Sequence, residues 1–534
     1  MKCIPFCLII LIFSSLAGCS SFISTDSGDE NEIHEPKNQI EEFETGLQKL
    51  YEGFSLSDPP EGVGHKLDNI DIGASQYLRK FWEFQELPTD EALNAWMDPD
   101  QPSMSKATWE SSNIFIWILY LRLDFQIRQC HDFLKKAENA DLDSVEDLQR
   151  LNEIKAEARF LRALTYWHFL DFFGNGVPFY SDDDDLGEPN DSMPPVNGFG
   201  GTEIFDFIEK ELQEVLSEES DVQLRPANAT LVGKANKAAA YMLLVKLYMN
   251  AEVYTNQSRW NDAKIALNQI MSTGYELERS YEHNFLADNH LSKEIIFSIP
   301  YEGESTSTYG GMTYILHASF GGDMESSYYG ISGGWGGNRA TVQLVEKFED
   351  HLQAQIDPRG VFYRGHNREN TSLFDFKDGY GVSKFKNITS LGYSGSDSKM
   401  VYPDTDFPMF RLADVYLMLA EIEARVDGKI SDWSHLEELW SRASLPLEVQ
   451  NDYKQEADID ALSFILDERA RELYWEGHRR TDLIRFGKFV KDYSWPFKGG
   501  SSLGAPSIPY RYNVLPIPDN ELMDNTNLKQ NPLW

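Results

Sequence analysis

The sequence predicts a mainly α-helical protein, in which a tetratricopeptide-like helical scaffold carries a loop-rich insert with short strands. Apolar residues recur at spacings of three and four along most of the chain, as they do in amphipathic helices. Some predicted helices are near neighbours in sequence, such as 231–252 with 259–272, which is typical of packed helix pairs. The insert is indicated by residues 310–337, where nine glycines occur within 28 residues.

The first residues have the pattern of a secretory signal. Lys2 precedes the apolar run 6–13, and the small residues of Leu-Ala-Gly-Cys end at Cys19. The run is shorter than the roughly 20 residues that a membrane-spanning helix needs. Because the ending resembles a bacterial lipobox, we expect residues 1–18 to be a lipoprotein signal peptide and Cys19 to be acylated. The alternative is an ordinary signal peptide with a chance cysteine. Residues 19–38 are polar and acidic, so we expect a flexible tether.

The remaining residues, 39–534, are expected to form a single body. Its helical scaffold is assigned to residues 39–294 and 406–534, and its insert to about 295–405. The apolar spacing predicts helices near residues 41–54, 107–137, 151–164, 203–217, 231–252, 259–272, 341–349, 410–426, 432–443 and 462–473. The clearest strand in the insert is the sequence EIIFSIPY. Glycine allows tight turns and close backbone approach, and binding residues concentrate on loops of this kind.

The charge of the chain excludes some partners. Asp plus Glu total 86 against 48 for Lys plus Arg, which gives a formal net charge of -38. Such a field repels phosphate backbones and anionic lipid headgroups, so nucleic-acid binding is not expected. Neutral ligands, cationic ligands and proteins with basic patches remain. The chain also has 12 Trp, 25 Tyr and 32 Phe residues, enough to supply both a core and a binding surface.

No catalytic or metal-binding motif stands out. The phosphate-binding loop and the His-Glu-x-x-His motif are both missing from the sequence. Cys130 and His478 lie in helical patterns and are expected to be packing residues. The acidic run 182–185 lacks the alternation of a calcium loop, so a solvated loop is favoured. We therefore predict no catalytic residue, no metal and no cofactor.

The aromatic residues of the insert point to a sugar ligand. A sugar ring has an apolar face that stacks on Trp or Tyr, while its hydroxyl groups need paired donors and acceptors. Trp335 stands among glycines, and Asn338 and Arg339 follow it. The fork of an Arg side chain can donate to two hydroxyl groups at once. The competing interpretation is a core Trp in a tight turn.

Several stretches resemble the SusD/RagB family of outer-membrane nutrient-binding lipoproteins. They are the lipobox, EARFLRA at 157–163, DFFG at 171–174 with Val177 and Pro178, FRLADVYLMLAE at 410–421, DERAREL at 467–473, RRTDLIR at 479–485, LPIP at 515–518 and QNP at 530–532. The resemblance implies a tetratricopeptide-like scaffold with a loop-rich glycan-binding face. It also implies a lipid-anchored protein on the cell surface that acts as a lid over a SusC-like TonB-dependent porin. On this resemblance, the helices that contain these stretches are mostly scaffold. We expect Arg159, Arg162, Arg411 and Asp414 to form polar links between packed helices.

Two further segments resemble the starch-binding branch of the family: 84–99, and 309–339 with its Gly-Gly-Trp-Gly-Gly-Asn-Arg ending. On this resemblance we expect Trp96, Tyr309 and Trp335 to form a platform for an α-glucan. We expect Asp98, Asn338 and Arg339 to contact hydroxyl groups, or else to brace the loops. The alternatives are another glucan, a peptide in the same uptake role, and a surface glycoside hydrolase with unrecognised carboxylates.

Overall fold

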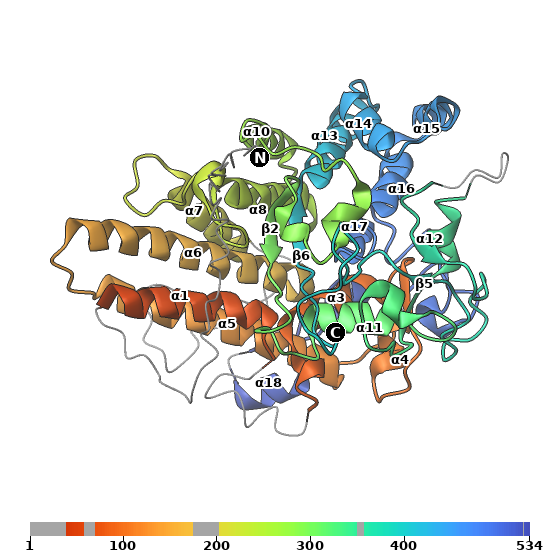
Figure 1. Cartoon of the computed structure of the whole chain (residues 1–534), viewed down its shortest axis with the longest axis horizontal. Helices are drawn as coiled ribbons and strands as arrows, with labels where there is room; N and C mark the ends of the chain where they lie inside the picture. Colours follow the sequence, from red (N-terminus) through yellow and green to blue (C-terminus); the bar gives the residue numbers. More distant parts are fainter. Residues whose placement is uncertain (1–38, 58–69, 175–201, 350–356, 527) are drawn as a thin grey trace, which may run out of the picture. The chain divides into compact units, whose positions relative to one another are not determined.

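Helices dominate the part of the chain that the structure describes, as the apolar spacing predicts (Figure 1). This computed structural model describes residues 39–57, 70–174, 202–349, 357–526 and 528–534. The signal peptide, Cys19, the tether, Val177 with Pro178 and the acidic run 182–185 lie outside these residues. The helices are α1 Gln39–Ser55, α3 Tyr77–Glu86, α4 Gln101–Lys106, α5 Ile114–Glu138, α6 Val145–Phe173, α7 Glu203–Leu216, α8 Lys237–Met249, α9 Ala251–Thr255, α10 Trp260–Met271, α11 Gly311–Ser319, α12 Val342–Glu346, α13 Leu412–Asp427, α14 Ser434–Arg442, α15 Leu447–Ile459, α16 Ala461–Leu473, α17 Arg479–Arg485 and α18 Asp519–Asp524.

The long helices α5 and α6 pack against each other, and α1 contacts both of them (Figure 1). The side chain of Asn113 accepts the backbone N–H groups of Phe115 and Ile116 and so fixes the first turn of α5. This cap places the start of α5 at Ile114 rather than near residue 107. Cys130 is fully buried in α5, as expected for a packing residue.

Ion pairs link α6 to α7. Arg159 and Arg162 of α6 both reach Glu211 of α7, each with 2.6 Å between a guanidinium nitrogen and a carboxylate oxygen. Glu211 is buried, so the two cations offset the cost of removing its charge from water. The expected polar link between packed helices is confirmed here.

The predicted helix pairs are present. α8 packs on α10, α13 packs on α14, and α13 also packs on α16. α8 begins at Lys237, later than residue 231, because the Asn236 side chain caps it by accepting the N–H of Ala239. Asp414 of α13 contacts Lys246 of α8 and accepts from Arg469 of α16 at 2.7 Å.

Some helices escaped the sequence analysis. All ten residues of α3 and all nine of α11 are buried. α11 is apolar on nearly every side, so its sequence lacks the contrast that the apolar spacing detects, whereas α3 does place Leu78, Phe81 and Trp82 at helical spacing. α11 lies inside the insert, which therefore has a helical centre under its loops.

Two small sheets connect the insert to the scaffold. The strands are β1 Ala92–Asn94, β2 Ile295–Ile299, β3 Asn338–Ala340, β4 Phe362–Tyr363, β5 Gly381–Val382 and β6 Phe407–Arg411. One sheet has the order β1-β3-β5-β4, and the other pairs β2 with β6 in antiparallel fashion. β1 precedes the insert by some 200 residues, yet it pairs with β3, with Leu93 opposite Arg339. β2 lies within the EIIFSIPY stretch, as predicted.

The two ends of the insert meet at Arg411. Its guanidinium group bonds Glu294 at 2.7 Å, just before β2, and also Glu472 of α16 at 2.7 Å and Glu476 at 2.6 Å. These four side chains are at most 1% exposed. Burial raises the pKa of Glu294, but Arg442 and Arg411 outweigh this effect and hold it below its usual value.

A second buried carboxylate, Asp406, has no such cation partner among its described hydrogen bonds. It accepts the backbone N–H of Tyr301 at 2.9 Å and the hydroxyl of Ser298 at 3.1 Å. Burial is the main cause that raises the pKa of Asp406 to about 7, against the lowering effect of these two hydrogen bonds. Asp406 therefore favours folding in its neutral form.

Within the described residues, no helix combines the length and the apolar composition needed to cross a membrane.

Replacing Arg411 by Met should destabilise the fold by up to about 3–5 kcal/mol at neutral pH, because three buried carboxylates each lose one of their cations and keep only Arg442, Arg359 or Lys384. The loss should shrink near pH 4, where the freed carboxylates take up protons. Urea unfolding at both pH values measures it. The control is Arg279→Met, since Arg279 is exposed. Equal losses for the two variants would contradict the role given to Arg411.

The wild-type protein should lose stability through Asp406 as the pH rises from about 4 to 7. The unfolded chain releases this proton near its ordinary pKa, whereas the folded chain keeps it up to about 7. At 1.36 kcal/mol per pKa unit the effect reaches about 4 kcal/mol. Asp406→Asn mimics the neutral acid, so its unfolding free energy should fall less over this range. A variant with an unchanged pH slope would argue against a neutral Asp406.

Candidate functional site

Four aromatic side chains from separate segments gather at one surface: Trp96, Tyr309, Trp335 and Tyr402, here called the ring platform. The ring centroids of Tyr309 and Trp335 are 6.4 Å apart with the planes inclined by 43°. Tyr309 and Tyr402 are 5.7 Å apart and inclined by 58°. Tyr309 is 55% exposed, and the other three rings are half-buried. The platform is therefore a faceted surface rather than a flat one.

Trp96 reaches the platform through strand pairing. The N–H of Ala95 donates to the carbonyl of Gly337 at 2.9 Å, which extends the β1–β3 pairing to the residue before Trp96. The indole N–H of Trp96 then donates to the backbone oxygen of Trp335 at 3.3 Å. Gly337 is required here, since a Cβ atom would lie 2.8 Å from the Trp96 ring.

Trp335 is held on the end of α11. Its N–H donates to the carbonyl of His317 at 2.7 Å, and its ring stacks on the His317 ring at 4.8 Å and 23°. Gly334 passes so close to Phe320 that a Cβ atom would lie 2.3 Å from the Phe320 carbonyl oxygen. Trp335 is thus supported on one side and half-buried, which differs from a core residue in a tight turn.

Tyr402 was not singled out from the sequence. It follows a tight turn in which the Asp397 carboxylate accepts the N–H groups of Lys399, Val401 and Tyr402 at 2.9 to 3.1 Å. The only sequence signal is the run SGSDSK at 394–399, which is rich in turn-forming residues but indicates no binding role.

Asn338 and Arg339 lie beneath the platform. Both are 0% exposed. Asn338 accepts from the hydroxyl of Tyr314 at 3.1 Å, and Arg339 donates to the carbonyls of Ser372 and Leu373 at 2.7 and 2.8 Å. These contacts brace the loops, which was the alternative held open for the two residues. Asp98, by contrast, is exposed and lies two residues after Trp96.

The charges below the rings are neutralised. Arg79 lies over the ring of Tyr314 at 4.1 Å and bonds Glu83 at 2.9 Å, and Lys80 also contacts Glu83. Burial raises the pKa of Glu83, but Lys80 and Arg79 outweigh it, so the carboxyl stays below its usual pKa. A carboxylate in this state is a poor proton donor. Glu83 is therefore unsuited to the general-acid role in glycoside hydrolysis.

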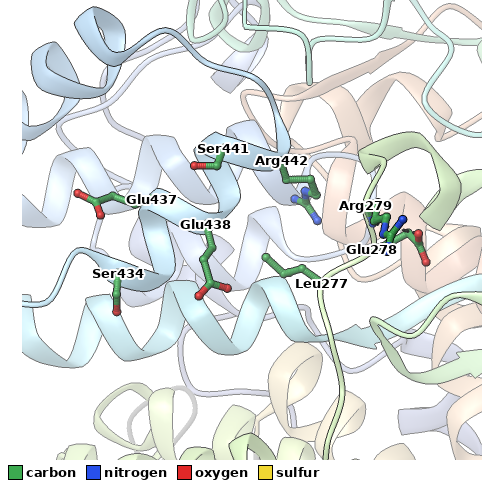
Figure 2. Close-up of a pocket in the computed structure, with 8 residues that line it drawn as sticks. All are labelled: Leu277, Glu278, Arg279, Ser434, Glu437, Glu438, Ser441 and Arg442. Atoms are coloured by element: carbon green, nitrogen blue, oxygen red, sulfur yellow. Dashed lines mark hydrogen bonds between the residues drawn. The ribbon is translucent and has the colours of Figure 1, made fainter.

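A hollow of about 540 Å³ lies elsewhere, between α14 and the segment 277–279 (Figure 2). Its lining consists of Leu277, Glu278, Arg279, Ser434, Glu437, Glu438, Ser441 and Arg442. None of these is aromatic, and Arg442 is committed to Glu294 and Glu472. Among the described residues, no group of three or more His, Cys, Asp or Glu side chains is placed to hold a metal ion. The ring platform is therefore the stronger candidate site.

Comparison with known proteins places the chain among close relatives of one family. The SusD family model matches residues 334–534. The starch-binding protein SusD of Bacteroides thetaiotaomicron is 34% identical over 514 residues, which cover 87% of each chain. SusD-like protein P25 of Formosa agariphila is 27% identical, over 72% of this chain and 74% of its own.

Solved structures share the fold at lower identity. Surface glycan-binding protein A from Bacteroides thetaiotaomicron, in complex with laminarihexaose, superposes with a TM-score of 0.66 at 19% identity. The superposition covers 92% of this chain and 99% of that one. A SusD superfamily protein from Parabacteroides distasonis reaches a TM-score of 0.68, also at 19% identity, with coverage of 92% and 99%. Given this shared fold and the 34% identity to SusD, the chain belongs to the SusD family.

Proposed function

We propose that this protein is a non-catalytic binder of glycans, with α-glucans of the starch and maltooligosaccharide type as its ligands. The observation that carries the proposal is the ring platform. Its neighbouring rings are inclined by 43° and 58°. A sugar chain that stacks on successive rings must therefore turn between them, as a curved α-1,4-linked chain does and a flat ribbon does not.

The energetics fit a site of modest affinity. Stacking one sugar face on a ring removes roughly 50 Å² of apolar area from water, on the order of 1 kcal/mol at about 25 cal/mol per Å². Several such contacts must also offset the cost of association. Long polymers gain from repeated engagement, so starch should bind more tightly than a short oligosaccharide. Asp98 is the exposed polar group nearest in sequence to Trp96 and is proposed to contact sugar hydroxyl groups.

Two relatives support a glucan as the ligand. The relative with 34% identity is named a starch-binding protein, whereas the structural neighbour at 19% identity holds laminarihexaose, a β-glucan. The higher identity favours the α-glucan, and another curved glucan is the second candidate. A peptide ligand remains as an alternative in the same uptake role. A surface hydrolase is a further alternative, in which Glu83 below the rings would not be the general acid.

The proposed role in the cell is delivery of the captured glycan to a SusC-like TonB-dependent porin in the outer membrane. This part rests on the family resemblance. The net charge of -38 suits a partner with a basic rim, because complementary charge accelerates association more than it raises affinity. The protein itself is proposed to be held at the cell surface by lipid on Cys19.

Replacing Trp335 by Ala should abolish or greatly weaken binding of maltoheptaose and starch, because the platform loses the ring next to Tyr309. The helical circular-dichroism spectrum should stay unchanged, since Trp335 is only half-buried. Isothermal titration calorimetry and gel retardation measure binding.

The matched control is Tyr328→Ala, which removes an aromatic residue of the same insert that is 75% exposed. It should bind as the wild type does. If Trp335→Ala binds normally, the glycan site lies elsewhere. If the wild type releases reducing sugars from starch, the protein is a hydrolase.

Membrane attachment should depend on Cys19. Several acyl chains bind a bilayer firmly, at about 0.8 kcal/mol per buried CH₂ group. Cys19→Ser should therefore yield unprocessed or detached protein in a membrane fractionation. An unmodified Cys19 thiol in the membrane-bound mature protein, detected by mass spectrometry, would refute the anchor.

A further inference from the structure

His317 occupies an unusual position under the ring platform. It belongs to α11, it is 2% exposed, and one face of its ring is covered by Trp335. Its Nδ1 lies 2.5 Å from the carbonyl oxygen of Gly333, and its Nε2 lies 2.9 Å from the carbonyl oxygen of Val401. The two carbonyls belong to different loops, one carrying Trp335 and the other carrying Tyr402.

A neutral imidazole cannot satisfy both carbonyls. It has one N–H group, and its other nitrogen presents a lone pair. With carbonyl oxygens at both nitrogens, one contact is then a hydrogen bond and the other brings two acceptors together. The imidazolium form donates from both nitrogens, and hydrogen bonds from a charged donor are the stronger kind. The geometry at both nitrogens therefore matches the protonated ring.

The two loops have one further direct link. The N–H of Ser332 donates to the carbonyl of Met400 at 2.7 Å. The His317 bridge, meaning its contacts with Gly333 and Val401, adds to this link on the side of the rings. When one contact of the bridge is lost, one of the two loops is held less firmly against α11.

We propose that His317 is the positioning residue of the ring platform, and that its protonation joins the Trp335 and Tyr402 loops and strengthens ligand binding. This inference rests on the proposed function of the platform. A ligand that needs both loops in place binds with an apparent Kd equal to the intrinsic Kd divided by the fraction of molecules with both loops held. Acidification raises that fraction.

The surroundings of His317 set the pH range. Burial lowers its pKa below the ordinary value, and the carbonyls of Gly333 and Val401 act in the opposite direction. α11 and the segment 332–337 contain no Asp, Glu, Lys or Arg, and the 397–402 segment contains Asp397 and Lys399. α3, which packs on α11, contributes Arg79 and Lys80, both paired with Glu83, and Glu86, which accepts the N–H of Gly477. The Asp397 carboxylate accepts backbone N–H groups of its own turn, and burial raises the pKa of the Tyr402 hydroxyl above its ordinary value. The change should therefore fall below pH 6.5.

The test compares the wild type with His317→Gln, whose amide cannot gain a proton and has one donor end and one acceptor end. Between pH 7.5 and 4.5 the wild-type affinity for maltoheptaose should rise about two- to tenfold, the worth of one net hydrogen bond. His317→Gln should lack this rise. The matched control His290→Gln changes an exposed histidine and should follow the wild type. Identical pH profiles for wild type and His317→Gln would overturn the proposal.

A measurement without ligand separates this proposal from the function of the platform. Hydrogen–deuterium exchange, corrected for the intrinsic pH dependence, should slow in 332–337 and 397–402 together as the wild type is acidified. This measurement uses only the wild type, so it remains valid even if His317→Gln fails to fold. If neither segment or only one gains protection, the bridge is not proton-dependent. If maltoheptaose fails to bind at any pH while both segments gain protection, the α-glucan function fails and the bridge stands.

Discussion

The closure of the insert at Arg411 is the constraint on which the ring platform depends. The residues before β2 and at the end of β6 meet through strand pairing and through the ion pair of Glu294 with Arg411. A long segment that leaves and returns at one point loses chain entropy, but this loss grows only slowly with length. The scaffold can therefore carry a large insert at little extra cost. Tyr309, Trp335 and Tyr402 all lie within it, and β1 brings Trp96 to them from outside.

Buried charge gives the fold two opposite dependences on pH. Glu294 and Glu472 are paired with arginines that lower their pKa values, so they stay ionised and their support is lost when acid protonates them. Asp406 is buried without such a cation, so it favours folding while it is neutral. Replacing a buried ion pair by apolar residues can be neutral in free energy, whereas removing one partner is costly. The value of the Arg411 cluster thus lies in fixing where the segments meet.

The sequence was sufficient for most of the longer helices with one apolar face, for β2 and for the family. α11 was missed because it is buried on all sides and has few polar residues, whereas α3 was missed although Leu78, Phe81 and Trp82 follow helical spacing. The pairing of β1 with β3 joins residues about 245 positions apart, and three-residue strands have no detectable pattern. For the same reason Tyr402 and His317 could not be assigned: their roles come from contacts between loops. Arg339 is suited to a sugar by its chemistry, and only the structure shows that it is buried.

The central claim is that four rings from separate segments form one glycan-binding surface. A crystal structure of the protein with maltoheptaose tests it most directly. The account predicts a curved sugar chain lying across Trp96, Trp335, Tyr309 and Tyr402, with Asn338 and Arg339 untouched beneath the loops. A sugar chain bound elsewhere, such as in the hollow between α14 and the segment 277–279, with the four rings left uncovered, would contradict it.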